Sequence, residues 1–363
     1  WNDVIGQAED IRWELYRLIY GVWDHIKNQP HKYINEKGEE AEMSHGAENY
    51  DLVWVGNMPG TRESRRLMGN YVLTADDILA NCRHDDAVAY GGWPMDEHVA
   101  GGFDAKGINP SIVRNVDGLY TIPYGCFCSK TISNLMMAGR NISASKLAMG
   151  STRVMATCAI GGEAAGTAAA LAVKHGVSPK EYGEQYMDEL QQTLMTDDCW
   201  LPGLRRRISD ICQNAALSAN CEQVENLRNG HDRPTDENGD NGCYLPLGEI
   251  AEYTLAKPTY VESVRLVFDS DLDRATITGG IESVKDCPTI CNRSADMTPF
   301  EFPTTMTDTF EILVDGEVLH RITGNRQRLV TLPIGKTADR IALRPIKTTG
   351  TAGTAHVFSF DFQ

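Results

Sequence analysis

Three features are missing from this sequence of 363 residues, and each absence argues against a class of protein. There is no uninterrupted apolar run of about 18 residues, which argues against a membrane-spanning helix. There is no excess of basic residues: the net charge is −16, which disfavours nucleic acid and anionic membranes as partners. Histidines and cysteines at zinc-ligand spacing are also missing, so no metal site is predicted.

Ten cysteines are present, but their spacing is irregular. The close pairs are Cys126 with Cys128 and Cys287 with Cys291. Cys158 falls within an alanine-rich stretch and is predicted to be a small buried residue. Cysteines in the C-terminal part would form disulfides in an oxidising compartment, although the sequence does not give their connectivity. A soluble protein is expected, and an extracytoplasmic location is slightly favoured.

The length of the chain and a change of pattern along it indicate two domains. Residues 1–205 mix helical and strand patterns, which is typical of an α/β domain. Residues 206–243 are polar and rich in turn signals, and we expect them to be a linker or a loop-rich boundary. From residue 244 to 363 apolar and polar residues alternate, as at Val264 and Leu266, which predicts an all-β sandwich of antiparallel strands.

Near the N-terminus, apolar residues at helical spacing predict an amphipathic helix over residues 4–28. They are Ile11, Leu15, Leu18, Ile19, Val22 and Ile26. Further on, the apolar residues 52–55 predict a short buried strand. Three arginines and a glutamate then lie between Arg62 and Arg66, either as a site for an anionic group or as an ion-pair network with neighbouring carboxylates.

The stretch from residue 134 to residue 176 carries the strongest local pattern. An apolar run over residues 135–138 stops at Gly139, which predicts a strand that ends at the edge of a sheet. After a polar loop, an alanine-rich run predicts a helix over residues 153–175.

The ends and the middle of this predicted helix carry further signals. Ser151 or Thr152 is expected to cap its start, and Gly176 to end it. Three glycines in its middle each cost about 1 kcal/mol relative to alanine, so we expect close approach of another backbone. They are Gly161, Gly162 and Gly166. Either the helix start faces an anionic ligand or an electron-rich ring, or the helix is simply packed in an α/β core.

Candidate catalytic residues lie in a glycine-rich segment over residues 84–108 that also carries acidic, aromatic and histidine side chains. Asp96 and His98 are two residues apart, so they would share one face of a strand or could converge on a loop. His98 is then either a general base for a hydroxyl proton or a structural histidine satisfied by Asp96. Tyr124, at the end of a predicted strand over residues 120–124, would either orient a substrate or serve packing.

Several motifs in order resemble the FAD-dependent oxidoreductase family, whose flavin domain is related to the glutathione-reductase and fumarate-reductase folds. They are Ala138-Gly139-Arg140, Asn141-Ile142-Ser143, Gly150-Ser151-Thr152-Arg153-Val154-Met155, and upstream runs at residues 61–74, 90–96 and 120–124. The resemblance covers roughly residues 1–205 and implies FAD as the cofactor. The residues that it implies for cofactor binding are Gly139, Arg140, Asn141, Ser143, Ser151, Thr152, Arg153, Val154 and Met155.

The chain departs from this family in three places. It has no G-x-G-x-x-G turn of the N-terminal βαβ unit, so the fold class expected is a partial FAD-binding domain followed by a jelly-roll sandwich. Either a partner chain or second copy supplies the missing half, or the sequence is a fragment of a longer chain whose N-terminal segment supplies it. A partner chain or a second copy is also expected to pack on the glycine face of the helix over residues 153–175. Lys146 and Gly125 stand where the family commonly has histidine and arginine.

Taken together, these features predict the flavin-closing and substrate-binding half of an FAD-dependent oxidoreductase. The reaction expected is hydride transfer to flavin from an alcohol on a small molecule, with a sugar as the candidate substrate. His98 would act as base, Asp96 would fix its tautomer and Tyr124 would orient the substrate. The alternative is a non-catalytic carbohydrate-binding or scaffold protein that has lost the cofactor, since the C-terminal region resembles galactose-binding-like, discoidin-type jelly rolls.

Overall fold

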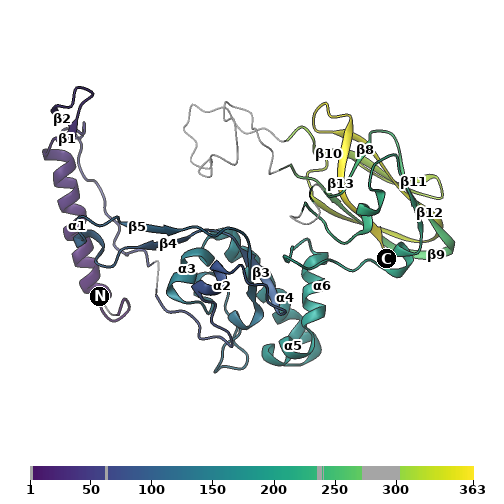
Figure 1. Ribbon diagram of the computed structural model, residues 1–363, viewed down its shortest axis with the longest axis horizontal. Coiled ribbons are helices and arrows are strands. Elements are labelled where there is room, and N and C mark those ends of the chain that lie inside the picture. The colour runs from purple at the N-terminus through teal and green to yellow at the C-terminus, as the bar shows by residue number, and fades with distance from the viewer. Residues whose placement is uncertain (1–2, 62–63, 235–238, 240, 272–302) are drawn as a thin grey trace. The chain divides into compact units, whose positions relative to one another are not determined.

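The computed structural model describes residues 3–61, 64–234, 239, 241–271 and 303–363 (Figure 1). The chain divides into two compact units, residues 1–66 and residues 67–363. Cys287 and Cys291, one of the close cysteine pairs, lie outside the described residues, as do Arg62 and Glu63 of the arginine cluster.

The first unit contains helix α1 (Ala8–Asn28) and a hairpin of β1 (His31–Ile34) and β2 (Glu40–Met43). α1 confirms the predicted amphipathic helix, yet none of its 21 residues, all of them described, is buried. The predicted buried strand at residues 52–55 is wrong, because the segment forms no strand and Val53 is 92% exposed. A strand needs a pairing partner, and β1 and β2 pair only with each other.

The second unit begins with a body of helices and short strands (Figure 1). In chain order its elements are α2 (Ala75–Leu79), β3 (Ala87–Gly91), β4 (Met95–His98), η1 (Gly102–Asp104), β5 (Ser111–Arg114), β6 (Tyr120–Pro123), η2 (Tyr124–Cys126), η3 (Gly139–Asn141), α3 (Lys146–Thr152), α4 (Met155–His175), α5 (Pro179–Gln185) and α6 (Met187–Thr196). β3 pairs with β6 and β4 pairs with β5, and both pairings are antiparallel. The mixed helix and strand content matches the sequence analysis, whereas every pairing between named strands is antiparallel.

Helix α4 is the longest helix of this body, and small residues form its buried face. They are Thr157, Gly161, Ala164, Ala165, Ala168 and Ala172. The expected close approach of another backbone is wrong for the described residues: a Cβ atom at Gly161 would lie 2.8 Å from Cε1 of the Phe127 side chain, and one at Gly162 or Gly166 would contact nothing within 4 Å. Gly176 ends the helix in the left-handed region, with φ 68°, as predicted.

By length and composition α4 would also suit a membrane span, with a mean hydropathy of 1.3 over an 18-residue window. The sequence analysis counted uninterrupted apolar runs, whereas the alanines of α4 raise its mean hydropathy between polar residues. One third of that window (33%) is buried inside the unit, and the core helix of a globular domain passes the same test.

The predicted strand over residues 135–138 is wrong. The only pairing that this segment makes within the described residues is an isolated bridge between Met136 and Cys128. Gly139 follows with φ +80° and opens the short helix η3. The run was too short to distinguish a strand from an irregular buried segment.

The predicted start of the long helix is also wrong in detail. α4 begins at Met155, because a separate helix, α3, already occupies the residues before it. Ser145 caps α3 by accepting a hydrogen bond from the N–H of Ala148. Ser151 and Thr152 therefore lie in the last turn of α3 and do not cap α4.

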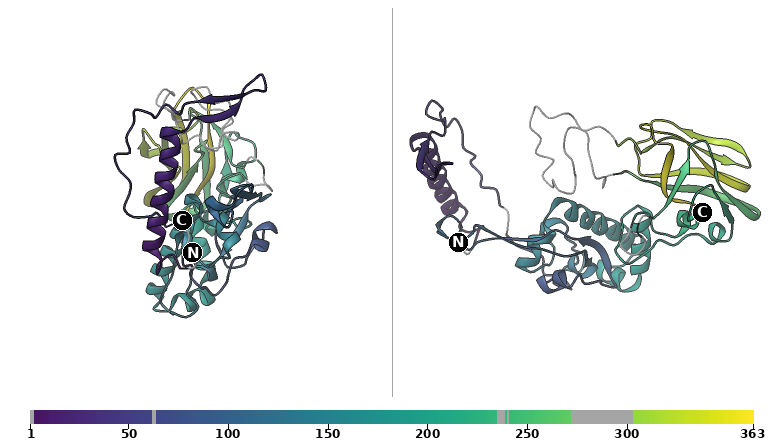
Figure 2. Two further views of the ribbon diagram at one scale, coloured as in Figure 1. Left: turned by 90° about the vertical axis from the view of Figure 1, so that its left-hand side faces the viewer. Right: turned by 45° about the horizontal axis from the view of Figure 1, so that its top comes forward.

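In the C-terminal part of the second unit, the named elements from residue 243 onwards are all strands, as predicted, and two short helices and one strand come directly before them. The elements of this part are α7 (Asp210–Gln213), β7 (Ala216–Ser218), η4 (Val224–Arg228), β8 (Cys243–Pro246), β9 (Ala251–Phe268), β10 (Thr307–Val314), β11 (Glu317–Ile322), β12 (Leu329–Thr348) and β13 (Thr354–Phe362). The strands form one antiparallel sheet in the order β11-β10-β12-β9-β13-β8, and β7 pairs with β9. Register shifts interrupt the pairing of the two longest strands, β9 and β12, and such shifts let a strand bend around a core (Figure 2).

Residues 206–243, the expected linker, add α7, β7 and η4 to this sandwich. Cys212 and Leu227 from this segment are fully buried in its core. Arg206 pairs with Asp361 over 2.5 Å and with Asp232 over 3.3 Å, and all three side chains are buried. The segment is therefore packed and ion-paired within the second unit.

Candidate functional site

Strand β4 brings Asp96 and His98 together, as their spacing predicted. Both side chains lie on one face of the strand, and His98 Nε2 is 4.0 Å from Asp96 Oδ2. The other carboxylate oxygen, Oδ1, accepts a hydrogen bond of 2.6 Å from Ser111 Oγ on the paired strand β5. Sequence reasoning missed Ser111, because only the register of the hairpin places it opposite His98.

Arg153 joins this pair from the short connection between α3 and α4. Its Nη2 donates to Asp96 Oδ2 over 3.1 Å and to the backbone oxygen of Asp96 over 3.4 Å. A carboxylate predicted to be catalytic and an arginine predicted to bind the cofactor therefore form one ion pair. The charge of Arg153 has a partner within the chain.

The ion pair depends on close packing of α3 against β4. A Cβ atom at Gly150 would lie 2.8 Å from the backbone oxygen of Asp96 and 3.1 Å from its backbone nitrogen. Only glycine lets the two backbones approach so closely, which brings the end of α3 and Arg153 to Asp96.

The three side chains differ in their exposure to solvent. His98 is 52% exposed, Asp96 is 28% exposed and Arg153 is 18% exposed. An imidazole open to a substrate, beside a more shielded carboxylate, is the arrangement that a histidine base requires. The partial shielding strengthens the attraction between Asp96 and Arg153 relative to that in water.

The start of α4 follows Arg153 directly. Val154 occupies the N-cap position without a side-chain hydrogen bond to the helix, so no side chain caps its first N–H groups. Met155, the first helical residue, is 89% exposed. An uncapped helix start is positive in electrostatic potential and suits an anionic or electron-rich group.

Two buried hydroxyl groups among the predicted cofactor-binding residues have no hydrogen-bond partner within the part of the chain that the structure describes. They are Thr152 Oγ1 and Ser143 Oγ, and each residue is only 1% exposed. Leaving such a group unsatisfied costs about 1–3 kcal/mol, so buried hydroxyls almost always have a partner. These two atoms therefore fit a ligand that supplies one.

Ser151, by contrast, is fully engaged inside the body. Its Oγ donates to the backbone oxygen of Trp93 over 2.5 Å and lies 2.6 Å from the hydroxyl of Tyr120. Burial raises the pKa of Tyr120 to about 12, although the hydrogen bond to Ser151 opposes the shift. These contacts tie α3 to the strands.

The remaining predicted cofactor residues lie around η3. Gly139 has a positive φ and Arg140 is exposed. The backbone oxygen of Asn141 accepts a hydrogen bond of 2.8 Å from the N–H of Leu67. Burial raises the pKa of the Cys158 thiol in α4, and the guanidinium of Arg140 partly offsets this, which places Arg140 within electrostatic reach of the first turns of α4.

Tyr124 lies in a different environment from Asp96 and His98. Its hydroxyl donates to the backbone oxygen of Pro179 over 2.8 Å, and its ring packs on Gly183, where a Cβ atom would lie 2.5 Å away. Burial raises the pKa of this phenol well above its usual range. In this structure Tyr124 therefore serves packing between η2 and α5.

Lys146 and Gly125, the two residues that depart from the family pattern, each contact a defined neighbour. Lys146 Nζ lies 3.8 Å from Glu97 Oε1, beside the catalytic candidates on β4. Gly125 packs tightly on Tyr71, because a Cβ atom would lie 3.0 Å from the Cβ of that residue. An arginine at residue 125 would need a different position of Tyr71.

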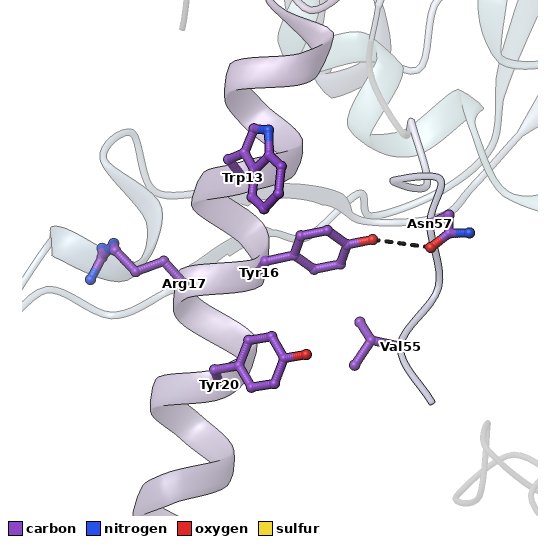
Figure 3. Close-up of a pocket in the computed structure, with 6 residues that line it drawn as sticks. All are labelled: Trp13, Tyr16, Arg17, Tyr20, Val55 and Asn57. Carbon is purple, nitrogen blue, oxygen red and sulfur yellow. Dashed lines mark hydrogen bonds between the residues drawn. The ribbon is translucent and has the colours of Figure 1, made fainter. Parts of the chain in front are cut away.

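A separate cavity of about 550 Å³ lies in the first unit, against α1 (Figure 3). It is lined by Trp13, Tyr16, Arg17, Tyr20, Val55 and Asn57. Tyr16 points across it, and its hydroxyl donates to Asn57 Oδ1 over 3.3 Å. None of the predicted site residues lines this cavity.

Comparison with known proteins gives one family and a group of similar folds. A family model described as FAD dependent oxidoreductase matches residues 2–194. No curated protein sequence matches the chain.

The similar solved structures resemble the C-terminal part of the chain. A GH31 CBM32-2 bound to GalNAc has a TM-score of 0.29 at 10% identity, over 41% of this chain and 96% of that one. The family 32 carbohydrate-binding module from Streptococcus pneumoniae EndoD has a TM-score of 0.28 at 15% identity, over 43% and 99%. The family 32 module from C. perfringens NanJ in complex with galactose has a TM-score of 0.26 at 12% identity, over 41% and 93%.

Proposed function

This chain belongs to the FAD dependent oxidoreductase family, and we propose that it supplies the flavin-closing and substrate-facing half of such an enzyme. The observation that carries the proposal is the contact between Arg153 and Asp96. It brings the predicted base, His98, next to the start of α4, where the predicted cofactor residues lie.

The residues around the start of α4 fit FAD. The unpartnered hydroxyls of Thr152 and Ser143 would donate to it, and the first N–H groups of α4 would face one of its electron-rich groups. Arg140 would add a positive charge, and Gly139 would let the backbone come close. The chemistry that bound FAD would supply is that of a hydride acceptor.

In this proposal, residues of this chain carry out the proton transfer. His98 takes the proton of a substrate hydroxyl as the hydride leaves the same carbon. In the substrate complex Asp96 would hold the imidazole in one tautomer once its 4.0 Å separation from His98 Nε2 shortens to hydrogen-bond length, while Arg153 and Ser111 fix the carboxylate. Tyr124 remains the proposed orienting residue, and in that role its hydroxyl would exchange Pro179 for the substrate.

The substrate class that we propose is a polyhydroxylated small molecule such as a sugar. Strand β4 presents Asp96 beside His98, and a carboxylate is a good acceptor for substrate hydroxyls. Trp93, just before β4, is 49% exposed and offers an aromatic face to a sugar ring.

A partner chain or a preceding segment of the same protein would supply the βαβ unit with the G-x-G-x-x-G turn, because this sequence carries none. This unit would pack on Gly162 and Gly166, because a Cβ atom at either residue would contact nothing within 4 Å. Gly161 is excluded from that surface by its contact with Phe127.

A second candidate function is a scaffold that has lost the cofactor. The observation that favours it is again the ion pair of Arg153, which satisfies the arginine without an anionic ligand. The unpartnered hydroxyls of Thr152 and Ser143 weigh against it, since a protein without a ligand gains nothing from them.

Anaerobic reduction of the flavin in the native protein, with its βαβ partner present, distinguishes the two functions. A panel of sugars and simple secondary alcohols is mixed with the oxidised protein, and the flavin absorbance is followed. The oxidoreductase predicts bleaching by at least one polyhydroxylated substrate. A flavoprotein that no alcohol bleaches contradicts the proposed substrate class, and a native protein without flavin favours the scaffold.

A further inference from the structure

Two cysteines of the sandwich lie against each other although they are 22 positions apart in the chain. Cys243 opens strand β8 and is fully buried in the sandwich core, while Cys221 is half-buried at the edge of that core. The Cys243 thiol lies 3.5 Å from the backbone oxygen of Glu222 and 3.4 Å from that of Gln223, the two residues that follow Cys221. The Cys221 thiol lies within electrostatic reach of Cys243, because it contributes to the raised pKa of Cys243.

Neighbouring contacts hold the two cysteines in place independently of the thiols. Asn226 Nδ2 in η4 donates to the backbone oxygen of Gly242 over 3.3 Å, directly before Cys243. A Cβ atom at Gly242 would lie 2.6 Å from the backbone oxygen of Val357, so this end of β8 is pressed against β13. The approach of Cys221 to Cys243 is therefore part of the packed fold.

We propose that Cys221 and Cys243 form a disulfide bond when the chain meets an oxidising disulfide. The bond closes a loop that contains Asp232, whose carboxylate pairs with Arg206 and Arg265 and whose backbone oxygen accepts from Arg328. Oxidation would thus cross-link the two ends of the segment between β7 and β8.

A small disulfide such as oxidised glutathione accepts the two electrons through thiol–disulfide exchange. The thiolate of Cys221, which is the more exposed of the two, attacks one sulfur of the oxidant, and one reduced thiol leaves. Cys243 then loses its proton and attacks the Cys221 sulfur of the mixed disulfide, and a second reduced thiol leaves. The protons of both cysteines end on the two thiols released. Burial and the neighbouring thiol raise the pKa of Cys243, so this thiol is protonated in the reduced chain and the first attack falls to Cys221.

The test uses the full chain, first reduced and then incubated with oxidised glutathione. Free thiols are alkylated without reductant, and the proteolytic peptides are mapped by mass spectrometry. The expected result is a peptide pair joined through Cys221 and Cys243 that separates on reduction. Alkylation of both cysteines after oxidation, or a bond from either to another cysteine, would overturn the proposal.

Thermal unfolding provides a second readout. The melting temperature of the oxidised chain should exceed that of the reduced chain by about 5–10 °C, since the bond restricts the unfolded state. Cys221→Ser should abolish the difference, whereas Cys82→Ser, at a half-buried cysteine of the α/β body, should preserve it. Equal melting temperatures of the oxidised and reduced wild type would contradict the proposal. If Cys221→Ser fails to fold, the peptide map of the wild type decides.

Discussion

Arg153 donates a hydrogen bond of 3.1 Å from Nη2 to Oδ2 of Asp96, and this contact joins strand β4 to the residue directly before the N-cap of α4. It connects the two halves of the candidate site: the histidine and carboxylate of β4, and the uncapped helix start with its unpartnered hydroxyls. Each prediction below changes one member of this arrangement.

Replacement of Asp96 by asparagine should destabilise the second unit by about 1–2 kcal/mol, because it weakens charge-assisted hydrogen bonds in a partly shielded place. Urea unfolding measures the change. Arg114→Ala is the matched control on the same hairpin: its ion pair with Glu97, at 3.2 Å, is more exposed, and its loss should change stability by less than about 1 kcal/mol. Equal effects of the two substitutions would show that the contact between Asp96 and Arg153 contributes no more than a surface pair.

Replacement of His98 by alanine should slow reduction of the flavin by substrate about 10²–10⁴-fold and leave the flavin bound, because a general base typically contributes that much. Anaerobic stopped-flow absorbance gives the rate. Lys146→Ala serves as control. Lys146 lies beside Glu97, whose side chain is on the other face of β4 from His98, so its loss should change the rate far less. An unchanged rate in His98→Ala would make this histidine structural.

Thr152→Val removes a buried hydroxyl that has no partner and keeps the shape of the side chain. We expect unchanged or slightly higher stability of the flavin-free chain, together with affinity for FAD about tenfold lower in the complex with its partner. Flavin fluorescence titration measures the affinity. Ser145→Ala, at the cap of α3, should do the reverse: it should cost about 1 kcal/mol of stability without loss of FAD affinity. Wild-type affinity in Thr152→Val would exclude this hydroxyl as a ligand of FAD.

The glycines of α4 should respond with opposite signs. Gly162→Ala has open space and should stabilise the isolated chain by about 0.5–1 kcal/mol through helix propensity, while weakening association with the partner. Gly161→Ala should destabilise the chain by about 1–3 kcal/mol, because its Cβ atom would press on Phe127. Thermal unfolding and native mass spectrometry provide the two readouts. Unchanged assembly in Gly162→Ala would remove this face from the interface.

Local patterns predicted much of the fold because their causes are local. Apolar spacing located α1, and the left-handed glycine at residue 176 located the end of α4. Alternation located the antiparallel strands of the sandwich. The break between α3 and α4 was missed because Arg153 and Val154 interrupt the helix through a contact with β4, which no local pattern encodes.

The candidate site was predictable in its residue types and less so in its contacts. The spacing of Asp96 and His98 suited a shared strand face or convergence on a loop, and β4 provides the strand. Ser111 could not be found without the register of the hairpin, and the role of Gly150 depends on the approach of two backbones. The sequence left Tyr124 open between orienting a substrate and packing, and the contact of its ring with Gly183 of α5 favours packing.

The flavin content of the native protein, isolated together with its βαβ partner, tests the central claim most directly. Absorbance in the flavin bands and release of the cofactor by denaturation should give one FAD for each copy of this chain. Loss of that flavin in a variant carrying both Thr152→Val and Ser143→Ala would support binding by the predicted residues. A native complex with an intact partner and no flavin would contradict the account.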